Sequence, residues 1–294
     1  MTKLQVLVAG SGVMGRGIAR SFVEIGLATA VLSRDPGKAA GLDSRIEILA
    51  EPPKEPPELV VESVPEVMDL KLALFARLEA AWGGAPILAS NTSGLSLQEI
   101  ADRLRHPERF VGIHYFQPAD VAPVVEVARV RQTDEAAFQR AAALVRASGK
   151  LPLLLREPVP GLLINRLQHA ILHEAYHLIE RGIVTAADVD LAAKELLGPR
   201  MSVTGLIEQK DISGLDTHAL AQAAIVPELH HGAEPLALVQ DKRRRNDIGV
   251  KTGVGFYDWR GFDPDYRGKA SALLGKVLAL LGRERPAGPP LARD

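Results

Sequence analysis

The chain has 294 residues, which at roughly 150 residues per domain is enough for about two domains. Its apolar share of 47% and charged share of 24% are those of a globular protein and exclude a disordered chain. A formal net charge of −1 excludes a general affinity for nucleic acid or for anionic membranes. The absence of cysteine excludes disulfides, thiolate catalysis and cysteine-bound zinc, and it fits a cytoplasmic protein. No stretch approaches the roughly 18 apolar residues of a membrane span.

The first half of the chain alternates short apolar runs with helical stretches. The expected strands are residues 4–9, 28–33, 45–49, 59–62, 86–90, 110–114, 124–130 and 151–155. The expected helices are residues 13–26, 65–82, 96–104 and 134–148. Continuous apolar strands that alternate with helices are typical of a parallel sheet covered on both faces. The pattern therefore predicts an α/β fold with a Rossmann-type, doubly wound and mostly parallel sheet.

The pattern changes near residue 157, where strands nearly disappear. We predict a dinucleotide-binding domain over residues 1–157 and an all-helical domain over residues 158–294. The expected helices there are residues 162–181, 186–197, 214–224 and 235–245, with Thr185 as an N-cap. The basic run at 242–245 is expected to be a solvated helix end or loop, and the Pro-rich tail from residue 286 is expected to fray.

A glycine-rich turn joins the first strand to the first helix. It comprises Gly10, Ser11, Gly12, Val13, Met14 and Gly15, which match the pattern G-x-G-x-x-G. In a βαβ unit the first glycine permits a tight turn, the second lets the backbone approach a pyrophosphate, and the third lets helix and strand pack closely. The helix N-terminus offers N–H groups to the phosphates. The turn predicts a dinucleotide site; the alternative is a structural turn of another α/β protein.

The end of the second strand bears on the choice of cofactor. NAD-binding units usually carry an acidic residue there, which binds the ribose 2′-hydroxyl. This chain has Ser33 in that place, followed by Arg34 and Asp35. Because an arginine suits a 2′-phosphate, we favour NADP, with NAD as a possible cofactor. The alternative is that Arg34 stacks on adenine while Asp35 binds the ribose.

Three further motifs follow in order: Ser-Asn-Thr-Ser at 90–93, Gly-Ile-His-Tyr-Phe-Gln-Pro at 112–118 and Gly-Leu-Leu-Ile-Asn-Arg-Leu at 161–167. Together with residues 211–216 and 251–257, they resemble the L-3-hydroxyacyl-CoA dehydrogenase family, in the lambda-crystallin-like superfamily. The resemblance covers roughly residues 4 to 260. It implies an NAD(P)-dependent oxidoreductase of fatty acid metabolism that interconverts 3-hydroxyacyl and 3-oxoacyl substrates. It also implies a homodimer formed by the helical domain and an active site between the two domains.

The resemblance also assigns roles by position. His114 matches the catalytic histidine and Glu126 its acidic partner, while Ser93 and Asn165 match polar residues beside the reacting oxygen. Glu66, Lys71 and Asn91 match positions near the cofactor.

The chemistry of these residue types fits that assignment independently. Alcohol oxidation requires a base for the hydroxyl proton while hydride leaves, and an imidazole can serve in both directions. A carboxylate on the other ring nitrogen fixes the tautomer. Hydroxyl and amide donors can hold the substrate oxygen as its charge changes.

The chain departs from the family pattern in two places. Tyr115 and Gln117 replace a phenylalanine and an asparagine in the histidine motif, so contacts to substrate or nicotinamide can shift. Fatty-acyl members of the family carry a long helical hairpin after the second strand, which helps to hold CoA. Here only residues 35–44 separate the second and third strands, and the next connection, residues 51–57, is a Pro-rich loop. This short member is therefore expected to use a short acyl thioester, on CoA or a carrier protein, or a small free 3-hydroxy acid.

Two other classes of function remain open. His173, Glu174 and His177 match H-E-x-x-H, which on a helix can bind zinc, and His169 lies one turn earlier. That pattern allows a zinc metallohydrolase, although our main interpretation assigns no metal site. A catalytically inactive, crystallin-like protein that only binds cofactor is the third hypothesis. A purely structural role is also open for Ser93, as the N-cap of the helix that follows it.

Overall fold

The structure, a computed structural model, describes residues 3–35, 37 and 41–285. It divides into two compact units, the first of residues 1–166 and the second of residues 167–294, and each is described by itself. The domain boundary that the sequence predicts at residue 157 lies nine residues before this division. The fraying predicted for the tail from residue 286 lies outside the described residues.

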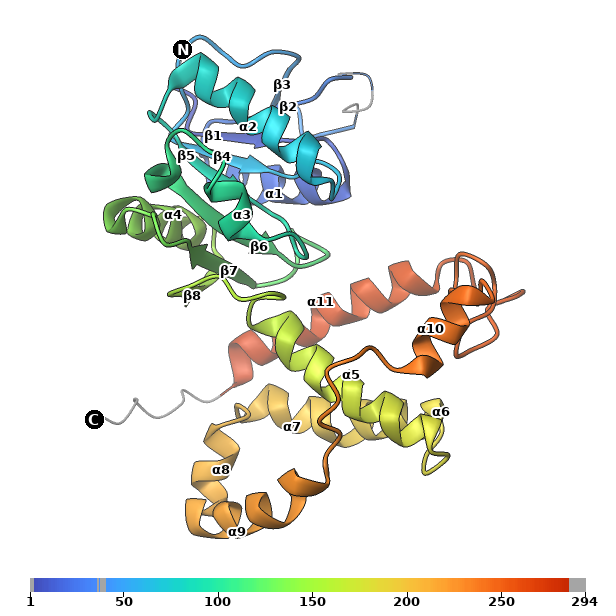
Figure 1. The fold of residues 1–294 in the computed structure, drawn as a ribbon. Coiled ribbons are helices and arrows are strands. Elements are labelled where there is room, and N and C mark those ends of the chain that lie inside the picture. Colours follow the sequence, from blue (N-terminus) through green and yellow to red (C-terminus); the bar gives the residue numbers. More distant parts are fainter. Residues whose placement is uncertain (1–2, 36, 38–40, 286–294) are drawn as a thin grey trace. The chain divides into compact units, whose positions relative to one another are not determined.

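One eight-stranded sheet organises the first unit (Figure 1). The strands are β1 (Val6–Ala9), β2 (Thr29–Leu32), β3 (Glu47–Leu49), β4 (Leu59–Glu62), β5 (Ile87–Ser90), β6 (Phe110–Tyr115), β7 (Val124–Arg129) and β8 (Leu151–Leu155). Their order is β3-β2-β1-β4-β5-β6-β7-β8, and every neighbouring pair is parallel except β6 and β7. The predicted doubly wound, mostly parallel sheet is confirmed.

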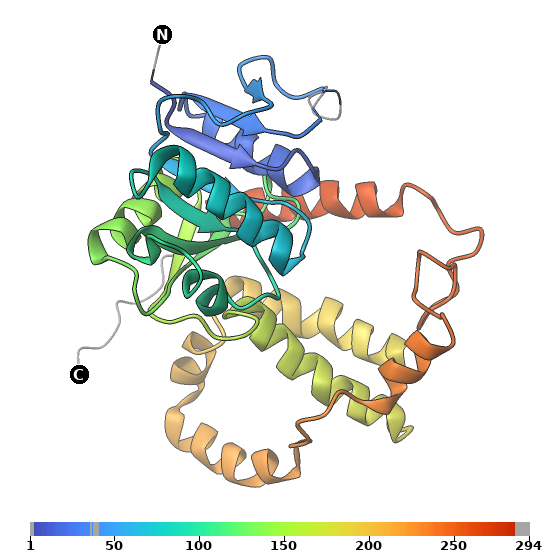
Figure 2. The ribbon, with the colours of Figure 1, turned by 45° about the horizontal axis from the view of Figure 1, so that its top comes forward.

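Helices cover both faces of this sheet (Figure 1 and Figure 2). They are α1 (Val13–Val23), α2 (Met68–Trp82), α3 (Leu97–Ala101) and α4 (Glu135–Ala147). Phe22 of α1 and Phe138 of α4 belong to one hydrophobic core, and Phe75 of α2 and Ile100 of α3 belong to the other. Because successive strand residues point to opposite cores, most strands are apolar throughout, as the sequence indicated.

The strand order reverses between β1 and β4, because β2 follows β1 on one side and β4 lies on the other. At such a point the loops after the two strands diverge and leave a crevice at the carboxyl edge of the sheet. The glycine-rich turn after β1 and the segment after β4 both begin there.

The second unit is helical, as predicted, and contains no strand among its described residues, apart from isolated β-bridges at Gly249–Val254 and Val254–Asp258 (Figure 1). Its helices are α5 (Ile164–Glu180, which begins in the first unit), α6 (Ala186–Ala192), α7 (Gly198–Val203), α8 (Glu208–Ser213), α9 (Leu215–Ile225), α10 (Ala237–Arg244) and α11 (Tyr266–Glu284). A π-helical turn at Ala193–Leu197 ends the regular α-helix that we expected to reach residue 197. Helices α7, α8 and α11 were not predicted. No described helix is long and apolar enough to cross a membrane.

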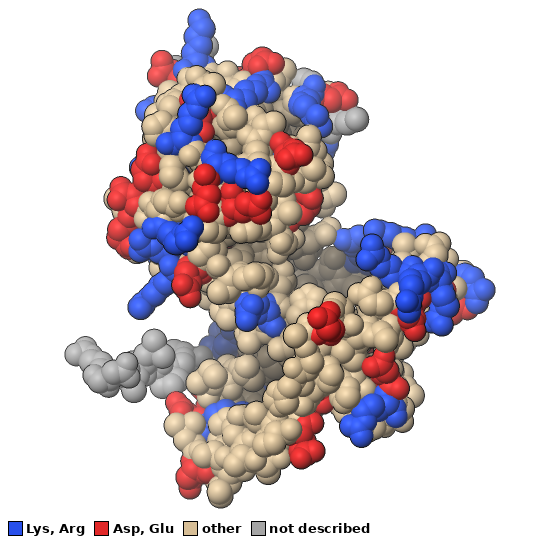
Figure 3. All heavy atoms as spheres, viewed as in Figure 1, with Lys and Arg blue, Asp and Glu red and all other residues tan. Residues whose placement is uncertain are grey.

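Two local predictions in this unit are confirmed. Thr185 caps α6: its hydroxyl accepts from the Asp188 N–H, and the Asp188 carboxylate accepts in return from the Thr185 N–H. The basic run at 242–245 lies at the C-terminal end of α10, where Figure 3 shows a group of Lys and Arg side chains at the surface. Positive charge at a helix C-terminus complements the helix dipole.

Candidate active site

A cleft of about 760 Å³ lies in the first unit, at the carboxyl edge where the strand order reverses. It contains nearly all the residues that the sequence assigned to a cofactor. These are Gly10, Ser11, Gly12, Val13, Met14, Ser33, Arg34, Glu66, Lys71 and Asn91, and Ser93 joins them. A volume of this size lies within the range of small-molecule and cofactor sites.

The three glycines of the turn have different surroundings. Gly10 has φ +130°, and a Cβ there would lie 2.4 Å from the Ser63 carbonyl oxygen. A Cβ on Gly15 would lie 2.0 Å from the Gly10 carbonyl oxygen, so Gly15 packs against the turn and does not line the cleft. A Cβ on Gly12 would meet nothing within 4 Å. This open space beside the first turn of α1, whose N–H groups lack intrahelical acceptors, fits a phosphate group.

Ser11 of this turn and Ser33, the residue after β2, are joined by a hydrogen bond. The Ser11 and Ser33 hydroxyl oxygens are 2.9 Å apart, and the Ser33 hydroxyl donates to the Asp35 carbonyl oxygen. Arg34 is exposed at this end of the cleft. Arg77, on α2, lines the same cleft and forms an ion pair with Glu51. Two guanidinium groups therefore border the cleft, and of these only Arg34 is among the predicted site residues.

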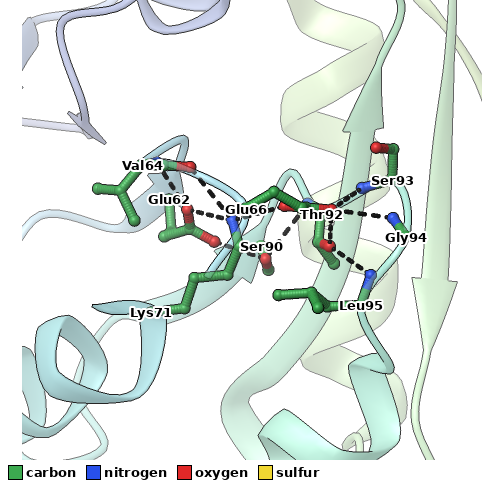
Figure 4. Close-up of polar contacts among 9 residues, drawn as sticks. All are labelled: Glu62, Val64, Glu66, Lys71, Ser90, Thr92, Ser93, Gly94 and Leu95. Carbon is green, nitrogen blue, oxygen red and sulfur yellow. Dashed lines mark hydrogen bonds and ion pairs between the residues drawn. The ribbon is translucent and has the colours of Figure 1, made fainter. Parts of the chain in front are cut away.

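A buried ion pair lies beneath the cleft (Figure 4). The Lys71 ammonium is 2.7 Å from Oε1 of Glu62, the last residue of β4, and both side chains are almost fully buried. The Ser90 hydroxyl donates to the other oxygen of Glu62 at 2.6 Å. Glu62 is not among the predicted site residues; its signal in the sequence is a single charge at the end of the apolar strand 59–62.

Glu66 fixes the loop that carries Ser93 (Figure 4). Its Oε1 accepts from the Thr92 hydroxyl at 2.6 Å and from the N–H groups of Ser93 and Gly94 at 3.0 and 2.9 Å. Burial opposes the charge of this carboxyl, but the hydrogen bonds from Thr92 and Gly94 and the nearby Lys71 lower its pKa to about 2. Glu66 is therefore an anion that holds the loop at neutral pH.

His114 and Glu126 form a buried pair on the only antiparallel neighbours of the described sheet. They face each other in the register of β6 and β7, and His114 Nδ1 lies 2.8 Å from Glu126 Oε2. His114 is 5% exposed and Glu126 is fully buried. The other oxygen of Glu126 accepts from the N–H groups of Leu163 and Ile164, where α5 begins. Burial opposes the charge of Glu126, but these hydrogen bonds hold its pKa below the usual range.

The remaining predicted residues lie on segments that adjoin these groups. Oδ1 of Asn91 accepts from the Tyr115 N–H at 2.8 Å, which leaves the amide NH₂ as the donor of that side chain. Ser93 is exposed and borders both the cleft and a smaller pocket of about 100 Å³, formed by residues 92–97 and 158–162. Asn165 is half-buried in the first turn of α5. The N-cap of α3 is Ser96, so the capping role considered for Ser93 is wrong.

The two substitutions in the histidine motif have different consequences. The Tyr115 side chain is buried in the core with α1 and α4, and burial raises its pKa. Only its backbone N–H reaches the site, through Asn91. Gln117 is exposed just beyond the end of β6. Phe116 packs edge-on against the His114 ring, with centroids 4.5 Å apart.

The H-E-x-x-H segment lies on α5 in the second unit, and its side chains have other partners. His173 binds the Gly232 carbonyl oxygen, and Glu174 accepts from the His230 N–H. His177 stacks on His230. Among the residues described, no cluster of three or more His, Asp or Glu side chains is arranged to hold a metal ion. These contacts join α5 to residues 230–232 and give the side chains of the H-E-x-x-H segment a structural role that needs no hydrolase activity.

Two models of one protein family match most of the chain. The model of the 3-hydroxyacyl-CoA dehydrogenase NAD binding domain matches residues 54–158, and that of the C-terminal domain matches residues 161–259. The crystal structure of a 3-hydroxyacyl-CoA dehydrogenase from Archaeoglobus fulgidus is 30% identical with a TM-score of 0.72, and the match covers 96% of this chain and 100% of that one.

Two relatives illustrate the range of names in the family. The human mitochondrial hydroxyacyl-coenzyme A dehydrogenase is 35% identical over 209 residues, which are 69% of this chain and 64% of that protein. The 5-formyl-3-hydroxy-2-methylpyridine 4-carboxylate 5-dehydrogenase of Mesorhizobium japonicum is 30% identical over 200 residues, 68% of this chain and 65% of that one. The chain thus spans slightly less than two thirds of the length of each. These matches favour a dehydrogenase over the zinc hydrolase.

The glycines of the turn can be tested separately. Gly15→Ala places a methyl group against the Gly10 carbonyl oxygen, so we expect the free energy of unfolding to fall by about 1–3 kcal/mol. Gly12→Ala meets open space and should keep its stability within about 0.5 kcal/mol. Its methyl group projects where a phosphate would lie, so nucleotide affinity should fall at least about tenfold. Denaturant unfolding and nucleotide titration measure both effects; unchanged affinity in Gly12→Ala would move the phosphates elsewhere.

Proposed function

The chain belongs to the 3-hydroxyacyl-CoA dehydrogenase family, and on that premise we propose that it interconverts a 3-hydroxyacyl and a 3-oxoacyl substrate by hydride transfer. The observation that carries the proposal is the buried His114–Glu126 pair, which lies in the same unit as the glycine-lined cleft. A hydride acceptor and an acid–base pair are the two requirements of reversible alcohol oxidation.

The residues of the first unit divide this work. A nicotinamide nucleotide, which residues 10–14 of the glycine-rich turn would hold, would supply or accept the hydride. Because Glu126 is anionic, the His114 proton is placed on Nδ1, and Nε2 is left to take or return the hydroxyl proton of the substrate. The Ser93 hydroxyl and the Asn165 amide are proposed to hold the reacting oxygen.

NADP is the cofactor that we propose over NAD. The family is an NAD-binding one, which supports a nicotinamide nucleotide without deciding between the two. At the end of β2 this chain has a serine, already engaged with Ser11 and Asp35, in place of an acidic residue. Arg34 and Arg77 border the same cleft, and a 2′-phosphate would be attracted by both guanidinium groups.

A short acyl thioester is the substrate that we propose, and a small free or carrier-bound 3-hydroxy acid is the second candidate. In the two connections that follow β2, the described residues 41–46 and 50–58 contain no helix, and Trp82 donates to the Pro53 carbonyl oxygen in the second of them. These residues therefore do not form the helical hairpin that would hold CoA. The similarity to a dehydrogenase of a pyridine carboxylate favours keeping the second candidate.

We propose a cytoplasmic location, which the cysteine-free sequence supports.

A homodimer through the second unit is part of the proposal. Of its described apolar side chains, Ala175 and Leu236 are buried, whereas many large ones lie open. The most exposed include Ile207 at 73% and Leu220 at 76%. Apolar surface of this extent marks an interaction site, and a second copy of the chain is the occupant that the family implies.

The cofactor and substrate are tested together by fluorescence titration of the purified protein with NADPH and NADH, followed by acetoacetyl-CoA. We expect tighter binding of NADPH and its oxidation when the thioester is added. Tight binding without oxidation would redirect the search to free or carrier-bound 3-oxo acids, and no binding of either nucleotide would overturn the function.

The role of Arg34 is tested by substitution. Arg34→Ala should weaken NADPH binding at least about tenfold and leave the NADH dissociation constant within about twofold. Arg103→Ala serves as the control, because Arg103 is an exposed arginine that pairs with Glu99 of α3. Equal losses for both nucleotides would assign Arg34 to adenine instead.

Removal of the His114 imidazole should abolish most of the turnover and leave nucleotide binding nearly unchanged. For His114→Gln we expect kcat to fall about 10²–10⁴-fold, because general acid–base catalysis is lost, while the nucleotide dissociation constant stays within about twofold. Steady-state kinetics and nucleotide titration separate the two effects. Near-normal turnover in a folded variant would exclude His114 as the base.

The dimer is tested by sedimentation velocity on the wild type. We expect a single species near twice the chain mass of 31.6 kDa. Leu220→Glu and Ile207→Glu place charges on the most exposed apolar side chains and should shift the protein toward monomer. A wild-type monomer at micromolar concentration would contradict the proposal.

A further inference from the structure

Lys150 is a buried lysine to which the proposed mechanism gives no role. It lies between α4 and β8, and only 6% of the residue is exposed. Its ammonium donates to the carbonyl oxygens of Asp120 and Ala122, each at 2.9 Å. Among the described residues no carboxylate pairs directly with it, and the carboxylate of Asp120 pairs with Arg20 instead. Burying an ammonium without a contacting carboxylate costs free energy, which the two hydrogen bonds must offset.

The two carbonyl groups belong to residues 116–123, which connect β6 to β7 and are called the hairpin loop below. The loop ends at Pro123, whose carbonyl oxygen accepts from the N–H of Leu151 at 2.7 Å. Three hydrogen bonds thus attach the second half of the hairpin loop to the chain at the start of β8, and Lys150 supplies two of them. One side chain therefore does most of the work of holding this loop.

The hairpin loop lies between the acid–base pair and the helix that begins at the glycine-rich turn. It connects the strands that bear His114 and Glu126, and its first residue, Phe116, packs edge-on against the His114 ring. Its other side rests on α1. Ala119 of the loop is buried in the core, and a Cβ on Gly17 of α1 would lie only 3.0 Å from the Ala119 Cβ. The missing side chain of Gly17 thus allows a close contact between loop and helix.

Reversible alcohol oxidation makes the spacing of these two elements important. The hydride leaves the substrate carbon for the nucleotide, while the proton leaves the attached oxygen for the imidazole. Both acceptors must therefore stand at a fixed separation, and a displacement of about 1 Å can cost about 10²-fold in rate. The nucleotide would lie at the N-terminus of α1, and the imidazole lies on β6, so a contact between α1 and the β6–β7 loop bears directly on that separation.

We propose that Lys150 is a positioning residue, which clamps the hairpin loop against α1 and thereby sets the His114 imidazole relative to the bound nucleotide. This inference rests on the proposed function and adds a residue to it. The clamp acts through the backbone of the loop, and Lys150 itself touches neither His114 nor Glu126 in the described contacts.

Three single variants separate positioning from simple stabilisation. Lys150→Met removes both hydrogen bonds and keeps an unbranched side chain in the buried site. Gly17→Ala acts on the loop from the other side, because its methyl group would have to displace Ala119. Ser148→Ala is the matched control: Ser148 is also buried after α4, and its hydroxyl donates to the Val145 carbonyl oxygen and not to the loop. Cooperative thermal unfolding checks that each variant folds.

Steady-state kinetics with acetoacetyl-CoA provide the first readout. Lys150→Met should lower kcat at least about tenfold, with KM and the nucleotide dissociation constant within about twofold of the wild type. The isotope effect on kcat, measured with nucleotide deuterated at the transferred position, should rise toward its intrinsic value, because hydride transfer becomes the slow step. Gly17→Ala should act in the same direction, and the double variant should lose less than the product of the two losses.

The control sets the limit of a structural explanation. Ser148→Ala should lower the thermal unfolding temperature but leave kcat within about twofold and the isotope effect unchanged. A folded Lys150→Met variant with the kcat and the isotope effect of the wild type would make Lys150 a purely structural residue and overturn the proposal.

Hydrogen exchange tests the clamp without turnover. The N–H groups of Val121 and Ala122 donate to the Pro118 carbonyl oxygen inside the hairpin loop. In Lys150→Met these two amides should exchange at least about tenfold faster, and in Ser148→Ala at the wild-type rate. Unchanged protection in Lys150→Met would overturn the proposal whatever the activity of the wild type. Faster exchange together with a wild type that does not reduce acetoacetyl-CoA would contradict the proposed substrate and leave the clamp standing.

Discussion

The carboxylate of Glu126 carries a charge inside the first unit, and the arrangement of the candidate active site depends on its two oxygens. A buried anion is tolerated only where hydrogen-bond donors replace water. One oxygen receives the His114 imidazole, and the other receives the N–H groups of Leu163 and Ile164. The same charge therefore orients the proposed base and fixes the start of α5, where Asn165 follows immediately. The turn before α5 contains Leu162 at φ +51°, a conformation that costs a leucine about 1 kcal/mol or more.

Glu66 repeats this arrangement at the other edge of the site. Each of the two carboxylates accepts two consecutive backbone N–H groups on one oxygen and a side-chain donor on the other. Both pKa values lie below the usual range, for the same reason. The loop that bears Ser93 and the first turn of α5, which bears Asn165, are thus held by charge-assisted hydrogen bonds, which are stronger and more directional than apolar contacts.

Much of the fold follows from features visible in the sequence, and much of the site's support does not. The eight strands were predictable because burial on both faces makes most of them continuously apolar. Helix α11 was missed, although Leu273, Leu274, Val277 and Leu280 follow helical spacing, since glycines at 268, 275 and 282 interrupt the stretch. His114 and Ser93 stand inside recognisable motifs. By contrast, the Glu62–Lys71 pair and the amides of Leu163 and Ile164 depend on which segments meet in space, which no periodicity reports.

The antiparallel pairing of β6 and β7 has a consequence for how the site assembles. Parallel neighbours need a crossover, so the bonds from Ser90 to Glu62 and from Gly94 to Glu66 each close a loop of 28 residues. The hairpin brings His114 to Glu126 across only 12 residues. By loop-closure entropy the shorter contact is cheaper by about 0.7 kcal/mol. The proposed acid–base pair is therefore the most local of these three contacts, and its formation has the lowest entropic cost of the three.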